Sequence, residues 1–171
     1  MKILKNLLLL VLITISAKGM AQRFATAIEL NDYLVSTTDS LYKAGTDWGT
    51  TMADVHESKK YYLLVEPRKK IENFISRKLN EFNSMQDQFG SEGLRKAMIS
   101  FLYVEKGMIE NSFKPFEKLN SSSSDTDIDA QIKALTKDSE KEDVELKKVN
   151  KAQAEFAEKN GFKIEETKEE K

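Results

Sequence analysis

Apolar residues recur at helical spacing along most of the chain, and no long run alternates apolar with polar residues. One stripe consists of Phe24, Ile28, Val35 and Tyr42, and a second follows at steps of four and three through Leu41, Gly45, Trp48, Met52 and Val55. Such steps place side chains on one face of an α-helix, so the pattern predicts a single long helix from about Phe24 to about Glu57. Gly45 and Gly49 weaken it by up to about 1 kcal/mol each, and a loop between them is the alternative.

A second helix is predicted from near Pro67, because proline suits the first turn of a helix, where its missing N–H would have no partner. The solid apolar run Tyr61–Val65 comes just before Glu66-Pro67. This run either ends the first helix or forms a packed connector, and one helix kinked at Pro67 is a further alternative. The apolar stripe of the second helix is Ile71, Phe74, Ile75, Leu79, Phe82, Met85 and Phe89.

A third helix is predicted after Gly90-Ser91, with Ser91 as its N-cap. Pro115 should kink or end this helix, since proline removes a backbone donor and crowds the preceding turn. Its apolar stripe is Leu94, Met98, Phe101, Leu102, Met108, Ile109, Phe116 and Leu119.

The serine-rich segment 121–126 is the clearest linker of the chain. A fourth helix is predicted after it, with aspartates near the N-terminus of the helix, where the helix dipole favours negative charge. Lys159-Asn160-Gly161 is predicted to end this helix. The seam of this helix consists of Ile128, Ile132, Leu135, Ser139, Glu142, Leu146, Val149, Gln153 and Phe156. Three of these nine positions are polar. Four helical segments with short connections predict an all-α fold, an antiparallel bundle of about four helices over residues 22–160. Residues 161–171 are predicted to form a charged, flexible tail.

Residues 1–21 have the three parts of a cleavable signal peptide. Lys2 and Lys5 give a basic start, an apolar run extends from Leu7 to Ile15, and small residues precede a cleavage site after Ala21. The apolar run is about half as long as a membrane-spanning helix needs, so we expect cleavage and no transmembrane segment afterwards. The protein is therefore expected to be exported, to the periplasm, the cell surface or the medium.

Composition excludes several chemistries. The chain of 171 residues has no cysteine and one histidine, which rules out disulfides, thiol nucleophiles, cysteine–zinc sites and metal sites of several histidines. Removing the three lysines of the signal peptide leaves 24 basic residues against 28 acidic ones, a net charge of −4. An acidic balance argues against binding to nucleic acid, where a basic face would be expected.

The sequence suggests three possible metal or cofactor sites, and none has the full set of residues or the setting that it requires. The segment starting at Asp125 resembles a calcium loop but has Ala130 where glycine is needed and Thr136 where glutamate is needed. His56-Glu57 begins like a zinc-protease motif, but Lys60 stands where the second histidine must be. Haem ligation by His56 and a methionine is disfavoured because methionines on apolar faces usually fill a core. We therefore expect no catalytic, metal-binding or cofactor-binding residues.

Trp48, Tyr61 and Tyr62 are the candidate contacts for a partner or ligand, because these aromatic residues flank glycines and a proline near segment ends. The favoured interpretation is that they close one end of the bundle.

The pattern Ala27-Ile28-Glu29-Leu30-Asn31-Asp32-Tyr33-Leu34-Val35, with Glu66-Pro67 opening a second helix, resembles uncharacterised exported helical surface proteins of Bacteroidetes and spirochaetes. The signal ending Gly19-Met20-Ala21-Gln22 also resembles exported proteins of the Bacteroidetes. The resemblance implies export and a helical fold, with no known activity and no functional residues to carry over.

The sequence thus predicts an exported, non-enzymatic helical bundle that binds a protein or a cell-envelope component. The incomplete seam of the last helix could accept a partner helix or be covered by self-association into a homo-oligomer. The alternatives are an exported small-ligand carrier, with a pocket near Trp48 and Tyr61-Tyr62, and a carboxylate-based hydrolase of the cell wall.

Overall fold

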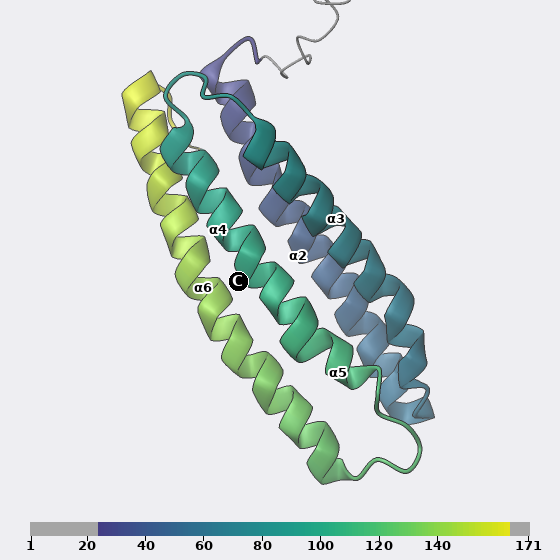
Figure 1. Cartoon of the computed structure of the whole chain (residues 1–171). Coiled ribbons are helices and arrows are strands. Elements are labelled where there is room, and N and C mark those ends of the chain that lie inside the picture. The colour runs from purple at the N-terminus through teal and green to yellow at the C-terminus, as the bar shows by residue number, and fades with distance from the viewer. Residues whose placement is uncertain (1–23, 165–171) are drawn as a thin grey trace, which may run out of the picture.

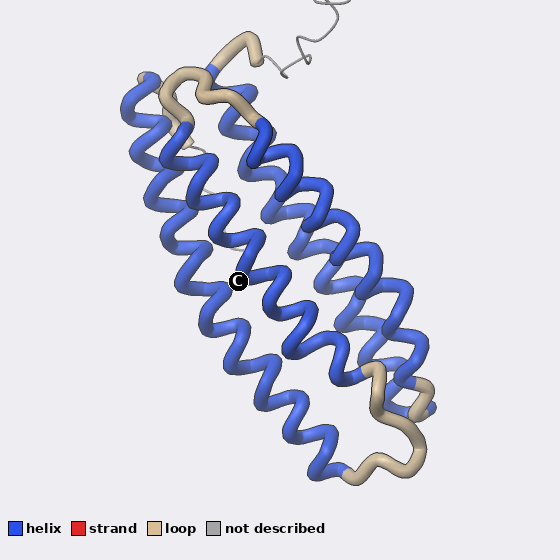
Figure 2. The backbone as a smooth tube through the Cα atoms, in the orientation of Figure 1, coloured by secondary structure: helices blue, strands red, loops and turns tan. Residues whose placement is uncertain are grey.

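A computed structural model describes residues 24–164, so the expected signal peptide and residues 165–171 lie outside the described part of the chain. The described residues form helices and no strand, which confirms the predicted all-α bundle (Figures 1 and 2). The elements in chain order are α2 (Ala27–Ser58), η1 (Tyr61–Leu64), α3 (Val65–Ser84), α4 (Glu92–Met108), η2 (Ile109–Phe113), α5 (Lys114–Phe116) and α6 (Asp125–Asn160).

Each long helix runs antiparallel to the one before it, and the bundle consists of two hairpins that pack together (Figure 1). One hairpin joins α2 to α3, and the other joins α4 to α6 through the serine-rich loop. α6 packs mainly against α4 and contacts α2 far less. The seam between α2 and α6 is therefore the least closed side of the bundle.

α2 is continuous through Gly45 and Gly49, so the predicted long helix is confirmed and the alternative loop is wrong. The helix begins at an N-cap, Thr26, whose hydroxyl accepts a hydrogen bond from the backbone N–H of Glu29. It ends at Lys59, whose φ of 55° is left-handed. The cost of two glycines within a helix of 32 residues is offset by its packing.

The first predicted stripe of α2 is not its buried face. Ile28 is 49% exposed and Tyr42 is 81% exposed. An apolar stripe at seven-residue spacing drifts by about 20° per heptad around a straight helix, so it does not stay on one buried face. A neighbouring face of α2 is richer in leucine and is buried instead. The buried residues of α2 are Leu30, Asn31, Leu34, Thr37, Leu41, Trp48 and Val55.

Residues 61–64 form the 3₁₀ turn η1, which confirms the packed connector. Tyr61 and Leu64 are fully buried, and the left-handed Lys59 before them excludes one helix kinked at Pro67. Pro67 lies in the first turn of α3, as predicted. α3 ends at Ser84, earlier than its stripe predicted, because Met85 adopts an extended conformation. Phe89 lies in the turn before α4, where it has a φ of 58° and is exposed.

Pro115 is accommodated by a π-helical turn. α4 widens into η2, where the N–H of Lys114 bonds the carbonyl of Ile109, and the helical path ends at Phe116. Proline donates no hydrogen bond and crowds the preceding turn, so a wider turn just before it relieves both problems. Ser91 precedes α4 without capping it, since its hydroxyl bonds a carboxylate oxygen of Asp87.

α6 ends where the sequence predicted, and it begins at Asp125, within the last two residues of the predicted linker. Ser124 and Asp127 form a capping box at its start, and Gly161 closes it with a φ of 69°. Its seam differs from the prediction, because Ile132 is exposed while Asp138 and Glu145 are buried. Phe162, which we expected in the flexible tail, packs edge-on against Phe156 with ring centroids 5.9 Å apart.

Candidate functional site

A groove follows the seam between α2 and α6, and two hollows of about 540 and 520 Å³ lie along it. The first hollow lies where the N-terminal half of α2 meets the segment after α6, and the second lies between the middle of α2, α4 and α6. Asp39 lines both hollows, so the two are neighbours along α2. We call this surface the α2–α6 groove.

Three residues of the first apolar stripe predicted for α2 line this groove. Ile28 and Val35 line the first hollow and Tyr42 lines the second. Their seven-residue spacing places them along one side of α2, where α6 leaves them partly uncovered. The second hollow is floored by apolar residues of α4 and the π turn, namely Phe101, Met108 and Phe113.

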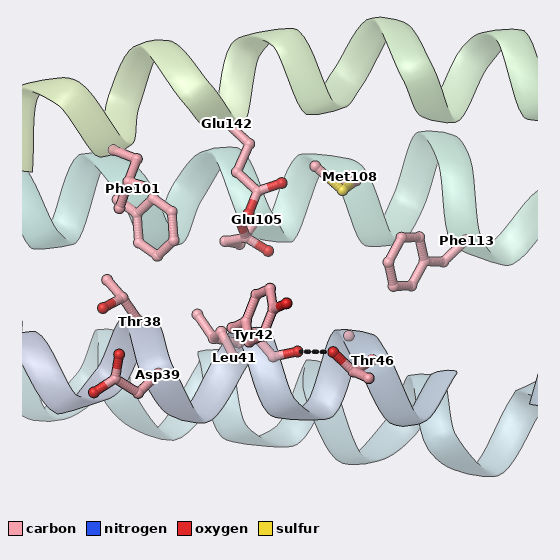
Figure 3. Close-up of a pocket in the computed structure, with 12 residues that line it drawn as sticks. Thr38, Asp39, Leu41, Tyr42, Thr46, Phe101, Glu105, Met108, Phe113 and Glu142 are labelled. Carbon is pink, nitrogen blue, oxygen red and sulfur yellow. Dashed lines mark hydrogen bonds between the residues drawn. The ribbon is translucent and has the colours of Figure 1, made fainter. Parts of the chain in front are cut away.

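Two carboxyl groups meet at the inner wall of the second hollow (Figure 3). Glu105 projects from α4 towards α2, and Glu142 reaches down from α6 to the same point. Glu105 is 8% exposed, and among the described residues no N–H or O–H group donates to its Oε1 atom. Its polar neighbour is the carboxyl group of Glu142, with which it shares a hydrogen bond when one of the two is protonated.

Burial and the neighbouring acid shift the ionisation of this pair. Burial, followed by the charge of Glu142 and the hydrogen bond to it, raises the pKa of Glu105 to about 8. Burial also raises the pKa of Glu142, while the hydrogen bond from Glu105 works in the opposite direction. At neutral pH, Glu105 is therefore mainly protonated and its O–H donates a hydrogen bond to the carboxylate of Glu142.

Two other acids of α6 make satisfied polar contacts with α4 and with the π turn that follows it. The hydroxyl of Ser100 donates to Glu145 over 2.8 Å, and the hydroxyl of Ser112 donates to Asp138 over 2.6 Å. Lys148 and Lys141 pair with the same two acids from the solvent side, each at 2.5 Å. Glu105 differs from these acids because, within residues 24–164, its Oε1 atom accepts no hydrogen bond from a serine or a lysine.

A second unpartnered oxygen lies further along the groove. Asn31 lines the first hollow, is buried, and its Oδ1 atom receives no hydrogen bond within the described part of the chain. Its amide nitrogen donates to Asp32 over 3.1 Å. A buried acceptor without a donor costs free energy, so this groove carries two positions at which a ligand could supply the missing hydrogen bond.

The three aromatic residues singled out from the sequence do not come together. Trp48 is buried in α2, and Tyr61 is fully buried in η1 with its hydroxyl 3.3 Å from Nδ1 of His56. Tyr62 is 63% exposed. Trp48 stacks on Phe113, which lines the second hollow, so its indole lies behind the wall of the groove.

The described residues offer no cluster of three or more histidine, cysteine or acidic side chains that could hold a metal ion. Asp127, in the segment that resembles a calcium loop, is engaged in the capping box with Ser124. Within residues 24–164, no helix combines the length and the apolar character needed to cross a membrane.

The sequence around Glu105 marks it as an unusual acid. Glu105 stands four residues after Phe101 and three before Met108, and therefore within the apolar stripe of its helix. An ionisable residue inside an apolar stripe is the kind of position at which a perturbed pKa is expected. Periodicity alone could not identify Glu142 as its partner, because that contact joins two helices.

Comparison with protein-family models, curated proteins and solved structures gives no match. The resemblance to exported helical surface proteins therefore stays a prediction.

Proposed function

We propose that the protein is an exported, non-enzymatic binding protein whose binding surface is the α2–α6 groove. The observation that carries this proposal is the stripe of Ile28, Val35 and Tyr42. These apolar side chains line the groove and stay partly exposed, although the bundle has a fourth helix beside them. An apolar stripe on a well-packed bundle is typical of a surface that receives a ligand or partner.

The groove supports a partner protein or another envelope component as the ligand. Its two hollows fall within the size range of small-molecule sites, and together they follow α2 from Ile28 to Thr46. At 1.5 Å per residue, this stretch of helix is roughly 27 Å long. The surface is therefore long enough for a chain-like ligand or for several turns of a partner helix.

The geometry of the carboxyl pair argues against the cell-wall glycosidase alternative. In glycosidases, two catalytic carboxyl groups stand roughly 5 to 9.5 Å apart, so that the scissile bond or a water molecule fits between them. Glu105 and Glu142 share a hydrogen bond and leave no such space between their carboxyl groups. The small-ligand alternative stays open, but the groove supports it better than the surroundings of Tyr61 and Tyr62 do.

The proposal is tested by crosslinking in the native cells. A photo-reactive phenylalanine analogue replaces Tyr42, which lines the groove, and in a matched variant it replaces Tyr62, which is exposed at the bundle end. We expect a defined adduct from position 42 and none from position 62. An adduct from position 62 alone would move the site to the bundle end, and a dimer linked through position 42 would assign the groove to self-association.

Export is tested separately on the wild-type chain. We expect the protein to be recovered from the periplasm, the cell surface or the medium with Gln22 as its first residue. Recovery of full-length chain from the cytoplasm alone would overturn this part of the proposal and leave the groove untouched.

A further inference from the structure

The second hollow combines an apolar floor with acidic side chains and lacks any basic one. Of the residues that line it, Asp39, Glu105 and Glu142 are acidic, and none is lysine, arginine or histidine. Tyr42 is the remaining titratable group, and Asp143 adds further negative charge next to Glu142. A ligand in this hollow therefore meets hydrocarbon on one side and carboxyl groups on the other.

Glu105 is the feature that points to a ligand. It is more than nine-tenths buried, it faces the hollow, and its Oε1 atom lacks a hydrogen-bond donor among the described residues. A donor that also carries positive charge would satisfy this oxygen and compensate the charge of the pair. A metal ion does not fit, because the described residues provide no cluster of three ligands.

From this arrangement, and resting on the proposed function of the groove, we infer that the ligand is an amphiphilic organic cation. Its ammonium group binds beside the Glu105–Glu142 pair, at the Oε1 atom of Glu105 that lacks a donor, and its apolar part lies against Leu41, Phe101 and Phe113. A primary ammonium has three donors, enough for both carboxyl groups. The hollow of about 520 Å³ is larger than one ammonium needs, so the apolar part contributes to binding by burying its surface.

Binding of a cation should release a proton. Glu105 is mainly protonated in the free protein at neutral pH, because burial and Glu142 raise its pKa to about 8. An ammonium in contact with it favours the ionised carboxylate, so the proton passes to solvent. Affinity for the cation should therefore increase as pH rises from about 6 to about 8, by up to about tenfold per pH unit where a whole proton is released.

The experiment compares three probes that share one chain length: decylammonium, decanol and decanoate. Trp48 is the one tryptophan of the chain and stacks on Phe113, so its fluorescence reports on occupancy of the hollow. At pH 7 we expect decylammonium to bind about tenfold more tightly than decanol, a difference of about 1.4 kcal/mol. Decanoate should bind more weakly than decanol, because its carboxylate meets acidic side chains.

Two variants separate a specific ion pair from general attraction to an acidic protein. Glu105→Gln should lower the affinity for decylammonium by about tenfold. The affinity for decanol should stay within about twofold of the wild-type value, because glutamine keeps the shape of the neutral acid. Glu158→Gln, at an exposed position of α6, removes one negative charge at the surface and should change neither affinity. Calorimetry in buffers of different ionisation enthalpy should show proton release in the wild type and none in Glu105→Gln.

The outcomes distinguish this inference from the proposed function. Equal binding of all three probes would overturn the preference for a cation and keep the groove as a binding surface. If no probe binds while position 42 still forms its adduct, the inference of an amphiphilic cation is overturned and the groove is retained as the binding surface. If a lysine-containing amphipathic peptide binds in the same assay and decylammonium does not, the site belongs to a lysine of a partner protein.

Discussion

The indole of Trp48 stacks on the phenyl ring of Phe113, with ring centroids 4.2 Å apart and planes inclined by 15°. This contact joins the middle of α2 to the π turn that precedes Pro115. Phe116 completes the cluster by meeting the indole edge-on at 5.6 Å. The π turn therefore places Phe113 where it both packs against the core and lines the α2–α6 groove.

We predict that Phe113→Ala lowers the free energy of unfolding by about 3 kcal/mol, because it removes a buried ring and the stacking partner of Trp48. The tryptophan emission should shift to longer wavelength as water reaches the indole. Tyr62→Ala, at an exposed aromatic position, should leave the free energy of unfolding within about 0.5 kcal/mol of the wild type. Denaturant titrations followed by fluorescence measure both variants, and equal losses would contradict the assignment of Phe113 to the core.

A second prediction concerns pH. In the folded protein the pKa of Glu105 is raised from 4.5 to about 8, so between these values the folded state binds more protons than the unfolded state. The free energy of unfolding should therefore fall as pH rises from about 4.5 to about 8, by a few kcal/mol at most. The raised pKa of Glu142 acts in the same direction.

The variant Glu105→Gln isolates this effect. Glutamine keeps the shape and one hydrogen-bond donor of the protonated acid, so we expect nearly wild-type stability at pH 5. Between pH 5 and pH 8.5 the variant should lose less stability than the wild type does. Carboxyl groups with lowered pKa, such as Asp138 and Glu145, change the free energy of unfolding only below about pH 4.5, so they do not disturb the comparison. Parallel curves for the two proteins would show that Glu105 ionises normally.

Much of the fold was predictable because it depends on local signals. The three- and four-residue spacing fixed the long first helix, and Pro67, Ser91, Pro115 and Gly161 marked segment boundaries within a few residues. The π turn at Ile109–Phe113 was not predicted. Proline indicates that the helix must adjust, but the kind of adjustment depends on packing around Trp48 and Phe116.

The site was harder to predict, because it depends on contacts between helices. Periodicity identified Ile28, Val35 and Tyr42 as a stripe but could not tell whether another helix covers it. The aromatic residues Trp48 and Tyr61 were predicted as contacts from their residue type, yet both are buried. The pairing of Glu105 with Glu142 and of Ser112 with Asp138 requires the register of α6 against α4 and the π turn, which no local pattern encodes.

A third prediction uses two glycines that differ in backbone conformation. A Cβ atom added at Gly49 or at Gly161 meets nothing within 4 Å, but Gly161 has a φ of 69° and Gly49 is helical. Gly49→Ala should therefore raise the free energy of unfolding by about 0.5 to 1 kcal/mol, since alanine loses less conformational entropy in a helix. Gly161→Ala should lower it by about 1 kcal/mol through left-handed strain. Thermal unfolding of both variants checks the opposite signs, and a change of the same sign in both would count against this account.

The last prediction concerns Arg68, a buried arginine in the first turns of α3. Its guanidinium pairs with Glu117, at 2.5 Å, and with Glu72. Arg68→Ala would leave Glu117 partly buried without a counter-charge, so we expect the free energy of unfolding to fall by about 3 kcal/mol. The double variant Arg68→Ala, Glu117→Ala should lose less than the sum of the two single variants, because each single change already removes the pair. Lys96→Ala, which breaks an exposed pair with Glu92, should leave stability unchanged within error. A loss at Arg68 no larger than at Lys96 would mean that the buried pair does not hold α3 to the segment after α5.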